Sequence, residues 1–484
     1  MENLDRMLPD ATASWRGVDV PALLYLITML VCYPLSYISR TYLHGQSPMV
    51  KHLYFAACGL TLMFANFGLD VGHSAVTVLV NFVLLVTVGG TALSVFLSFT
   101  FNLGYLLVGY VYFATDGYDL IWTTPHCILS LKMIGMAFDL FDGHKDEAKL
   151  SHEQKQFNIK EAPSLLELFG YTYYIGSCFA APIFSVRQYL EFTAEKLLDN
   201  GEGHRPDCVR PALERFAVGC VYLVLYTALV PLFPYEYLFS AEFADSSYFY
   251  QIFVVLCWGK ISMFKYGVIF LFAEGVAIMS GMGYNGKDEH GNALWDGCVS
   301  FRPMVFELAT VCNDVVRSFN VSTNLWVSRY IYKRLKFLNN RHFSQASTLF
   351  FLAVWHGFYV GYFVSFTQEF FVFFIEAQVA ETVRRSPTLG KITSQPVIRV
   401  FLLMVMKFWN TYVICHALVP FILLRWRRIR VVYTAMNYLT LWFYAVTILL
   451  FQFAILPRLR KTSRKSGDEA APIKDGDGET MKTK

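Results

Sequence analysis

Charged residues are scarce in this sequence, and their scarcity excludes a soluble protein. Asp, Glu, Lys and Arg make up 16% of the 484 residues, whereas soluble globular domains carry about 25%. The formal net charge of +4 is also too small to indicate binding to nucleic acid. We therefore expect no nucleic-acid partner.

The ten cysteines form neither a C-x-x-C pair nor a spacing typical of a metal site. Most of them lie in apolar stretches, where cysteine behaves as a small hydrophobic residue. This pattern argues against a disulfide framework and predicts no metal. The cysteines are Cys32, Cys58, Cys127, Cys178, Cys208, Cys220, Cys257, Cys298, Cys312 and Cys415.

Hydrophobic residues, by contrast, make up 55% of the chain and aromatic residues 17%. This composition predicts an all-α, polytopic membrane protein with about ten to eleven membrane helices. We expect a polar segment at 1–19, one membrane domain at 20–456 and a charged, disordered, cytosolic tail at 457–484. The N-terminus lacks a basic segment followed by an apolar core, so no cleaved signal peptide is predicted.

The apolar run at 73–114 is too long for one crossing of a membrane. Breaks at Gly89–Gly90 and near Asn102–Gly104 predict that it forms two helices. Single spans are expected at about 20–37, 50–68, 216–234, 248–280, 397–424 and 431–456.

The stretch that follows this run is apolar overall but holds the ionisable residues His126, Lys132, Asp139 and Asp142. Charged groups in contact with lipid are costly. We therefore expect this segment to be buried against other helices or to be re-entrant.

The stretch from Arg341 to Glu369 has no Asp, Glu, Lys or Arg between its ends and predicts one membrane helix. His356 lies near its middle, roughly 20 Å from either end at ~1.5 Å rise per residue. An ionisable group near the bilayer midplane indicates a functional site; the alternative is a histidine hydrogen-bonded between packed helices. Gly357 and Gly361 form a G-x-x-x-G step, which lets another backbone come close.

Three cations precede this stretch. In an α-helix with ~100° per residue, Arg329, Lys333 and Lys336 share one face, while Arg334 points elsewhere. The three cations could neutralise the phosphates of a polyanionic substrate, such as a nucleotide-bearing cofactor. The alternative is an anchor that contacts lipid head groups.

Asn320 and Asn324 are polar residues in a weakly apolar context just upstream of the cations. Asn320-Val321-Ser322 also matches the N-glycosylation sequon. Glycosylation requires a lumenal position, whereas the nearby cations favour a cytosolic or buried one. The cations therefore argue against a glycan at Asn320.

No G-x-S-x-G elbow accompanies a catalytic triad, and no phosphate loop or dinucleotide fingerprint is present. A buried histidine, an amide and a basic entrance suit acyl transfer, because histidine can take the proton of an attacking hydroxyl. The amide can donate to the oxyanion that forms on the carbonyl. A transporter could equally use the histidine as a proton relay. From these residues alone, an enzyme and a transporter both remain open.

The stretch FNVSTNLWVSRYIYKRLKFL, followed by LFFLAVWHGFYVGY, resembles the signature of the membrane-bound O-acyltransferase family. The asparagine of that signature is Asn320 and its W-H-G histidine is His356, 36 residues later. Further stretches between about Tyr118 and Glu369 resemble, in the right order, a branch of the family that acylates lysophospholipids. They are YDLIWTTPHCILSLKMIGMAFDLFDG, APSLLELFGYTYYIGSCFAAPIFSVRQY, WGKISMFKYGVIFLFAEGVAIMSGMGYNG and LWDGC.

The resemblance implies an all-α domain around a buried reaction chamber. It implies transfer of an acyl chain from acyl-CoA to the sn-2 hydroxyl of lysophosphatidylcholine, and of lysophosphatidylethanolamine and lysophosphatidylserine. His356 would be the general base and Asn320 its catalytic partner. Transfer would be direct, because no nucleophilic Ser or Cys stands beside His356 in the sequence; Cys127 stays open as a neighbour in space.

Acyl-CoA would be a substrate, so no cofactor is expected, and the lysophospholipid would enter laterally from membrane lipid. The residues expected to bind acyl-CoA are Arg329, Lys333 and Lys336. The residues that match branch motifs and would line or support the chamber are Trp355, His126, Trp295 and Asp296.

The resemblance implies a multi-pass protein of the endoplasmic reticulum membrane. Related chains often end in a dilysine retrieval signal, whereas this one ends Met481-Lys482-Thr483-Lys484. The expected location therefore rests on the supply of acyl-CoA at the cytosolic face. A family member with a protein or sterol acceptor, and a non-catalytic transporter, are the two rival predictions.

Overall fold

The computed structural model describes residues 20–113, 120–197 and 206–457. This part of the chain forms helices joined by loops and contains no β-strand. The prediction of an all-α protein is therefore confirmed. The predicted polar segment at 1–19, and the predicted tail at 457–484 except Pro457, lie outside the described residues.

Among the described residues, seven helical stretches are long and apolar enough to cross a membrane, and a bent pair raises the number to eight. The prediction of a polytopic membrane protein is confirmed. The number is below ten because Pro48–Val88 forms one apolar stretch where two spans were predicted, and because α5 (Thr123–Gly143) carries three charged residues. The seven stretches are α1 (Val20–Tyr42), α2 with α3 (Pro48–Phe67 and Val71–Val88), α4 (Ala92–Tyr112), α9 (Val209–Leu229) with its final turn to Leu232, α11 (Tyr248–Ser280), α16 (Val360–Arg385) and α18 (Pro396–Leu423).

The remaining helices are shorter or more polar. They are α5 (Thr123–Gly143), α6 (His152–Phe157), α7 (Leu165–Thr172), α8 (Val186–Thr193), α10 (Ala241–Asp245), α12 (Pro303–Leu308), α13 (Cys312–Ser318), α14 (Val321–Val327), α15 (Arg341–His356), α17 (Pro387–Ser394), α19 (Trp426–Ala435) and α20 (Leu439–Leu449).

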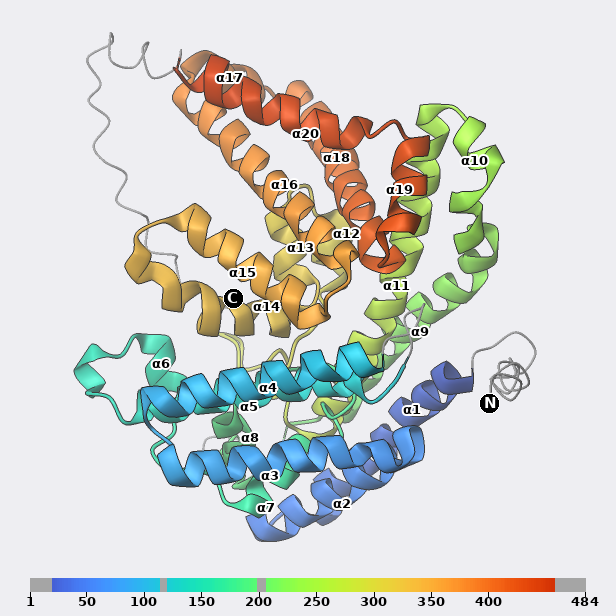
Figure 1. Ribbon diagram of the computed structural model, residues 1–484. Helices are drawn as coiled ribbons and strands as arrows, with labels where there is room; N and C mark the ends of the chain where they lie inside the picture. Colours follow the sequence, from blue (N-terminus) through green and yellow to red (C-terminus); the bar gives the residue numbers. More distant parts are fainter. Residues whose placement is uncertain (1–19, 114–119, 198–205, 458–484) are drawn as a thin grey trace.

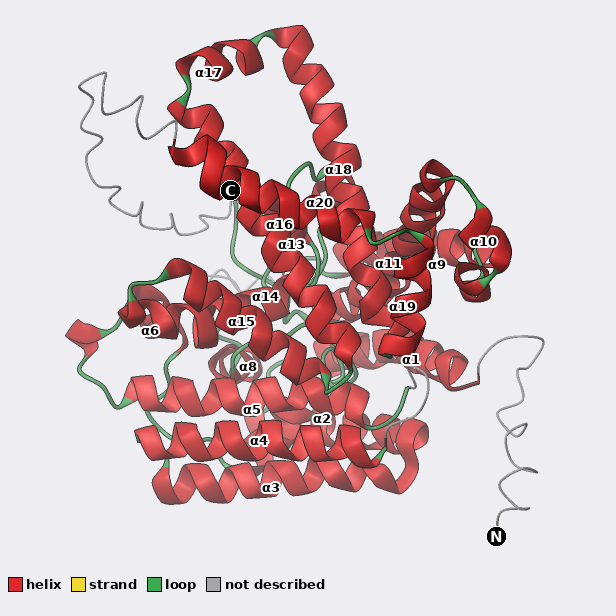
Figure 2. Ribbon diagram, turned by 45° about the horizontal axis from the view of Figure 1, so that its top comes forward, coloured by secondary structure: helices red, strands yellow, loops and turns green. Residues whose placement is uncertain are grey.

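The helices form two groups that meet around α14 and α15. Helices α1 to α5 lie together on the lower side of Figure 1, and Figure 2 shows α3, α4 and α5 side by side. Helices α16, α18 and α20 lie on the opposite side. The long helix α11 joins the groups, because it packs against α1 and α9 of the first part of the chain and against α18 of the last.

The predicted break at Gly89–Gly90 is confirmed, since α3 ends at Val88 and α4 begins at Ala92. The second predicted break, near Asn102–Gly104, is wrong, because α4 continues through it. Asn102 does not interrupt the helix; its amide exchanges hydrogen bonds of 2.8 and 2.9 Å with the amide of Asn81 on α3. Paired amides of this kind hold membrane helices together.

Helix α5 is buried on nearly all sides, as its polar residues predicted. Lys132 is 2% exposed and donates to the hydroxyl of Ser177 over 2.7 Å. Asp139 accepts a hydrogen bond of 2.7 Å from the hydroxyl of Tyr330. Each charged group thus has a partner within the protein, as burial of a charge requires.

The predicted span at 431–456 is not one straight helix. The chain forms α19, turns at Asn437 and Tyr438, and continues as α20 and a π-helical turn (Leu450–Ile455), with an angle of 81° between the two parts. Asn437 and Tyr438 have φ of 51° and 54°. This left-handed conformation ends a right-handed helix, and it cannot be read from an apolar pattern.

Candidate active site

The prediction of one helix from Arg341 to Glu369 is wrong, because α15 ends at His356. Gly357 has φ +121° and ψ 179°, a region open essentially to glycine alone. The chain leaves the helix there and starts α16 at Val360, and the two helices diverge from this break in Figures 1 and 2. His356 therefore lies at the end of a helix.

The second glycine of the G-x-x-x-G step does allow a close backbone approach. The amide of Gly361 donates to the carbonyl of Leu424 over 2.9 Å. A Cβ at Gly361 would lie 2.0 Å from the carbonyl oxygen of Pro420. The start of α16 thereby packs against the end of α18, close to His356.

Aromatic rings surround the imidazole of His356. Its ring centroid lies 4.9 Å from that of Phe421, 5.3 Å from that of Tyr362 and 5.7 Å from that of Phe366, with which it stacks. Neither ring nitrogen has a hydrogen bond to another described residue. The rings fix the imidazole from the sides while its nitrogens remain available to a substrate.

His356 and Asn320 line one cavity of about 220 Å³. The walls come from α11, α13, α14, α15, α16 and α18, and they are mainly apolar. The lining residues are Met263, Tyr266, Phe270, Cys312, Val315, Val316, Phe319, Asn320, Thr323, Asn324, Leu352, His356, Ser365, Phe366, Glu369, Val372, Val413, Ile414, Ala417, Leu418 and Phe421. The structure thus brings together the two residues that the family signature named.

Asn320 occupies the N-cap of α14 with φ 50° and ψ 45°, a left-handed conformation that asparagine tolerates better than most residues. Its backbone carbonyl accepts from the amide of Asn324 over 3.1 Å, and the next amide, of Val321, donates to Ser300 over 2.9 Å. The side-chain oxygen Oδ1 is buried and accepts no hydrogen bond from any residue that the structure describes. Backbone contacts therefore fix Asn320, while its amide side chain is left for a ligand in the cavity.

The surroundings of the sequon argue against glycosylation. Ser322 is 6% exposed, and its hydroxyl lies 3.5 Å from that of Ser300. A glycosylated asparagine needs an exposed surface position, whereas Asn320 faces the cavity.

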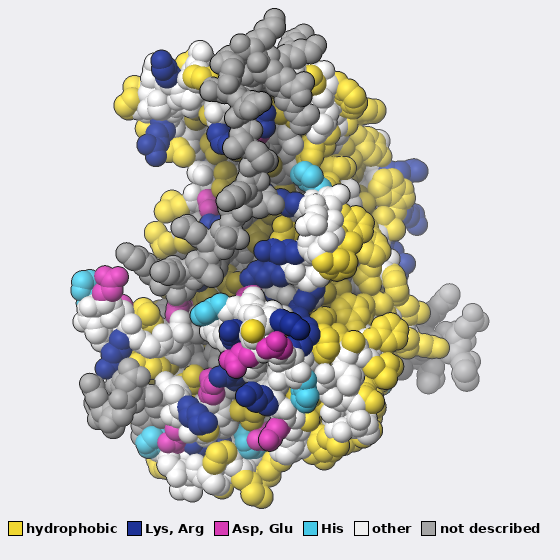
Figure 3. Space-filling view, turned by 90° about the vertical axis from the view of Figure 1, so that its left-hand side faces the viewer, with side chains coloured by type: hydrophobic (Ala, Val, Ile, Leu, Met, Phe, Trp, Pro, Cys, Tyr) yellow, Lys and Arg dark blue, Asp and Glu magenta, His cyan; other side chains and the backbone are white. Residues whose placement is uncertain are grey.

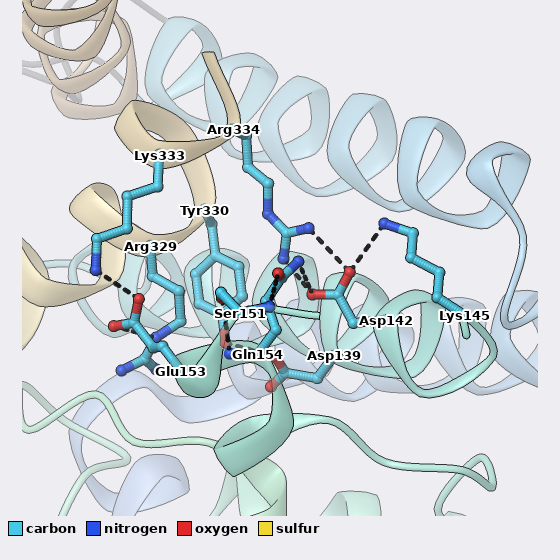
Figure 4. A network of polar contacts seen from close by, with 10 residues as sticks. All are labelled: Asp139, Asp142, Lys145, Ser151, Glu153, Gln154, Arg329, Tyr330, Lys333 and Arg334. Carbon is cyan, nitrogen blue, oxygen red and sulfur yellow. Dashed lines mark hydrogen bonds and ion pairs between the residues drawn. The ribbon is translucent and has the colours of Figure 1, made fainter. Parts of the chain in front are cut away.

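The segment that carries Arg329, Lys333 and Lys336 is not the regular α-helix from which we predicted that they share one face. It forms a π-helical turn at Ser328–Tyr332 and a 3₁₀ turn at Lys333–Leu338. Arg329 and Lys333 nevertheless come together, because both contact the carboxylate of Glu153 on α6, at 3.3 and 2.6 Å (Figure 4). Lys336 is exposed and takes no part in this contact.

Further contacts hold helix α6 against the cationic segment at 328–338. The guanidinium of Arg329 lies 3.5 Å from the ring centroid of Phe157. Arg334, which does point elsewhere, donates to Asp142 over 2.9 Å, and Gln154 donates to the same carboxylate over 3.1 Å. Lys and Arg side chains gather on this face of the molecule (Figure 3).

The cations also set the charge of Glu153. Burial raises the pKa of its carboxyl, but the hydrogen bond from Lys333 and the charges of Arg329 and Lys333 outweigh burial and lower the pKa below its usual range. The carboxylate is therefore ionised at neutral pH, and its ion pairs are lost only as the pH falls through that lowered pKa.

Four predicted supporting residues do not line the cavity. The ring centroid of Trp355 lies 4.6 Å from that of His356, and its indole N–H donates to the carbonyl of Cys127 over 3.0 Å. His126 is 1% exposed and meets the ring of Trp122 edge to face in a separate pocket. Trp295 packs on Tyr284, and Asp296 accepts from Asn285 over 2.9 Å, both in the loop after α11.

The cavity also holds polar groups that were not predicted, namely Glu369 and Thr323. Glu369 stood out in the sequence only as the charge that ends an apolar run. The hydroxyl of Thr323 is buried without a partner. Its position one turn after Asn320 was the available signal for a residue on the same helix face.

Residues 107–419 match the membrane-bound O-acyltransferase family. The chain therefore belongs to this family and is a multi-pass membrane acyltransferase, as its signature predicted. Proteins called lysophospholipid acyltransferase 5 are similar to it over most of their length. That of Homo sapiens is 36% identical over 451 residues, covering 93% of this chain and 92% of the relative. That of Bos taurus is 38% identical over 445 residues, covering 92% and 90%, and that of Drosophila melanogaster is 35% identical over 483 residues, covering 98% and 95%.

Proposed function

We propose that this protein transfers an acyl chain from acyl-CoA to the sn-2 hydroxyl of a lysophospholipid in the endoplasmic reticulum membrane. Lysophosphatidylcholine is the main acceptor, with lysophosphatidylethanolamine and lysophosphatidylserine as further ones. Acyl-CoA is consumed as a substrate and no further cofactor takes part. The observation that carries the proposal is the shared cavity of His356 and Asn320 in a chain similar to lysophospholipid acyltransferases.

In the proposed reaction, His356 takes the proton of the sn-2 hydroxyl as its oxygen attacks the thioester carbonyl carbon. Asn320 donates its amide N–H to the carbonyl oxygen, which becomes negatively charged. The C–S bond then breaks, the ester remains on the lipid, and the CoA sulfur receives the proton from the imidazolium. Within the described part of the chain, the nitrogens of His356 accept and donate no hydrogen bond and Oδ1 of Asn320 has no partner, which suits these roles.

Direct transfer fits the positions of the thiols near the site. Cys127 does not line the cavity, and its sulfur donates to the carbonyl of Thr124 over 3.0 Å. Cys312 does line the cavity but is 1% exposed. A deeply buried thiol of this kind is a poor nucleophile.

A transfer assay tests the proposal. Purified protein supplied with acyl-CoA and lysophosphatidylcholine is expected to release free CoA and form phosphatidylcholine in equal amounts. CoA release that needs a sterol or a peptide in place of the lysolipid would identify the rival acceptor class. Absence of CoA release with all acceptors would support the transporter.

Neutralising Arg329, Lys333 and Lys336 to glutamine is expected to raise KM for acyl-CoA about tenfold or more and to leave KM for the lysolipid almost unchanged. Charge-assisted contacts to phosphate contribute ~1.5–3 kcal/mol each, and ~1.4 kcal/mol is tenfold. Steady-state kinetics with each substrate varied in turn gives both values.

Two control variants sharpen this measurement. Glu153→Gln removes the carboxylate that competes for the same cations, so it is expected to lower KM for acyl-CoA. Neutralising Arg384, Arg385 and Lys391, which lie at the far end of α16 and on α17, changes the charge equally and is expected to alter neither KM. If the variant without the charges of Arg329, Lys333 and Lys336 raised KM equally for acyl-CoA and for the lysolipid, these three residues would be a membrane anchor.

A further inference from the structure

Glu369 places a carboxyl group in the cavity of His356 and Asn320. It lies on α16, and the carboxyl has no hydrogen bond or ion pair with any described residue. Most other carboxylates near the core are used by the protein: Asp142 binds Arg334, and Glu376, two turns further along α16, accepts from the amide of Cys312 over 3.0 Å. The carboxyl group of Glu369 is therefore available to a ligand in the cavity.

The cavity offers no cation to balance this carboxyl. None of its described lining residues is Lys or Arg. An ionised carboxylate in apolar surroundings is costly unless a positive group pairs with it. A positive group on the molecule that enters the cavity would supply this pairing.

Aromatic rings complete the surroundings of this carboxyl. Tyr266, Phe270, Phe319 and Phe366 line the same cavity. Faces of aromatic rings attract organic cations, and quaternary ammonium groups are commonly bound in this way. A carboxylate with several rings therefore suits an ammonium group and disfavours the phosphates of CoA.

Glu369 lies on the same side of α16 as the residue that stacks on His356. Ser365, Phe366, Glu369 and Val372 share the cavity-facing side of α16. The ring of Phe366 stacks on His356 at 5.7 Å, and Glu369 begins one turn further along the helix, a rise of about 4.5 Å. In the acceptor lipid, the nitrogen of the head group is joined to the reacting sn-2 carbon by a short phosphodiester chain.

We propose that Glu369 binds the ammonium group of the acceptor head group and thereby selects lysolipids that carry a cation. This assignment rests on the proposed function, because it presumes a lysophospholipid acceptor. Glu369 is a specificity-determining residue, and it orients the lipid so that its hydroxyl reaches His356. The competing role for the same carboxyl is that of a proton partner of His356, which would act on every acceptor alike.

Glu369→Gln tests the proposal, because glutamine keeps the size of the side chain and removes its charge. The acceptors are lysophosphatidylcholine, which carries a cation, and lysophosphatidylglycerol, which does not. The ratio of kcat/KM between them is expected to fall about tenfold, the factor that one charge-assisted contact supplies. KM for acyl-CoA is expected to stay within about twofold, as is kcat/KM for lysophosphatidylglycerol.

Glu381→Gln makes the same change on the same helix outside the cavity, where Glu381 pairs with Arg384, and is expected to leave the ratio unchanged. Glu369→Asp keeps the charge and is expected to retain much of the preference for lysophosphatidylcholine over lysophosphatidylglycerol. If the glutamine variant does not fold, the ratio of kcat/KM between the two acceptors is measured on Glu369→Asp. An equal loss with both acceptors, or a shifted pH profile of kcat with both, would overturn the proposal. A wild-type protein inactive on every lysophospholipid would refute the proposed function instead.

Discussion

His356→Ala is expected to lower turnover by ~10²–10⁴-fold, the usual contribution of a general base. The protein should stay folded in detergent, because the imidazole has no hydrogen bond to a described residue and its removal leaves no buried partner unpaired. The measurement is CoA release at saturating substrates, together with the elution profile of the purified variant.

Cys312→Ala serves as the matched control, since Cys312 lines the same cavity. It is expected to keep near wild-type turnover if transfer is direct. Near wild-type turnover by a folded His356→Ala protein would contradict the assignment of the base. His126 would then be the next candidate, although it lies in a separate pocket.

Asn320→Asp and Asn320→Ala are both expected to lower kcat by ~10²–10³-fold, because loss of an oxyanion donor costs ~3–4 kcal/mol. Aspartate keeps the size of the side chain but removes the N–H donor and adds a charge, so it should be as damaging as alanine. Turnover and acyl-CoA binding are measured separately, and binding is expected to persist in both variants.

Ser322→Ala separates this role from glycosylation. It destroys the sequon, yet it removes only a hydroxyl that lies 3.5 Å from Ser300. The variant is expected to stay active and to migrate unchanged on a gel. A faster-migrating Ser322→Ala protein, or an active Asn320→Asp enzyme, would show that Asn320 has another role.

The sequence indicated Asn320 and His356 because each belongs to one of the two stretches that resemble the family signature. It also predicted the burial of α5, since a helix with Lys132 and Asp139 cannot face lipid. Only the family resemblance predicted a reaction chamber shared by the two residues. In the structure, Asn320 and His356 line the same cavity.

The parts that escaped prediction depend on dihedral angles or on distant pairs. Gly357 in an apolar run is compatible with a continuing helix until its φ of +121° is known. The contacts of Glu153 with Arg329 and Lys333 join positions 176 and 180 residues apart. No local pattern marks such partners, and the same holds for the cavity-facing position of Glu369.

The pairing of α5 has a consequence for how this chain is made. Asp139 and Asp142 find their partners in Tyr330 and Arg334, which follow them by 191 and 192 residues. At ~5–20 residues per second, those partners emerge from the ribosome roughly 10–40 s after α5. During that interval Asp139 lacks the hydrogen bond from Tyr330, whereas Asp142 can already pair with Lys145. The polar contacts that join α5 to the second half of the chain therefore form late in synthesis, and a chain truncated before Tyr330 would lack them.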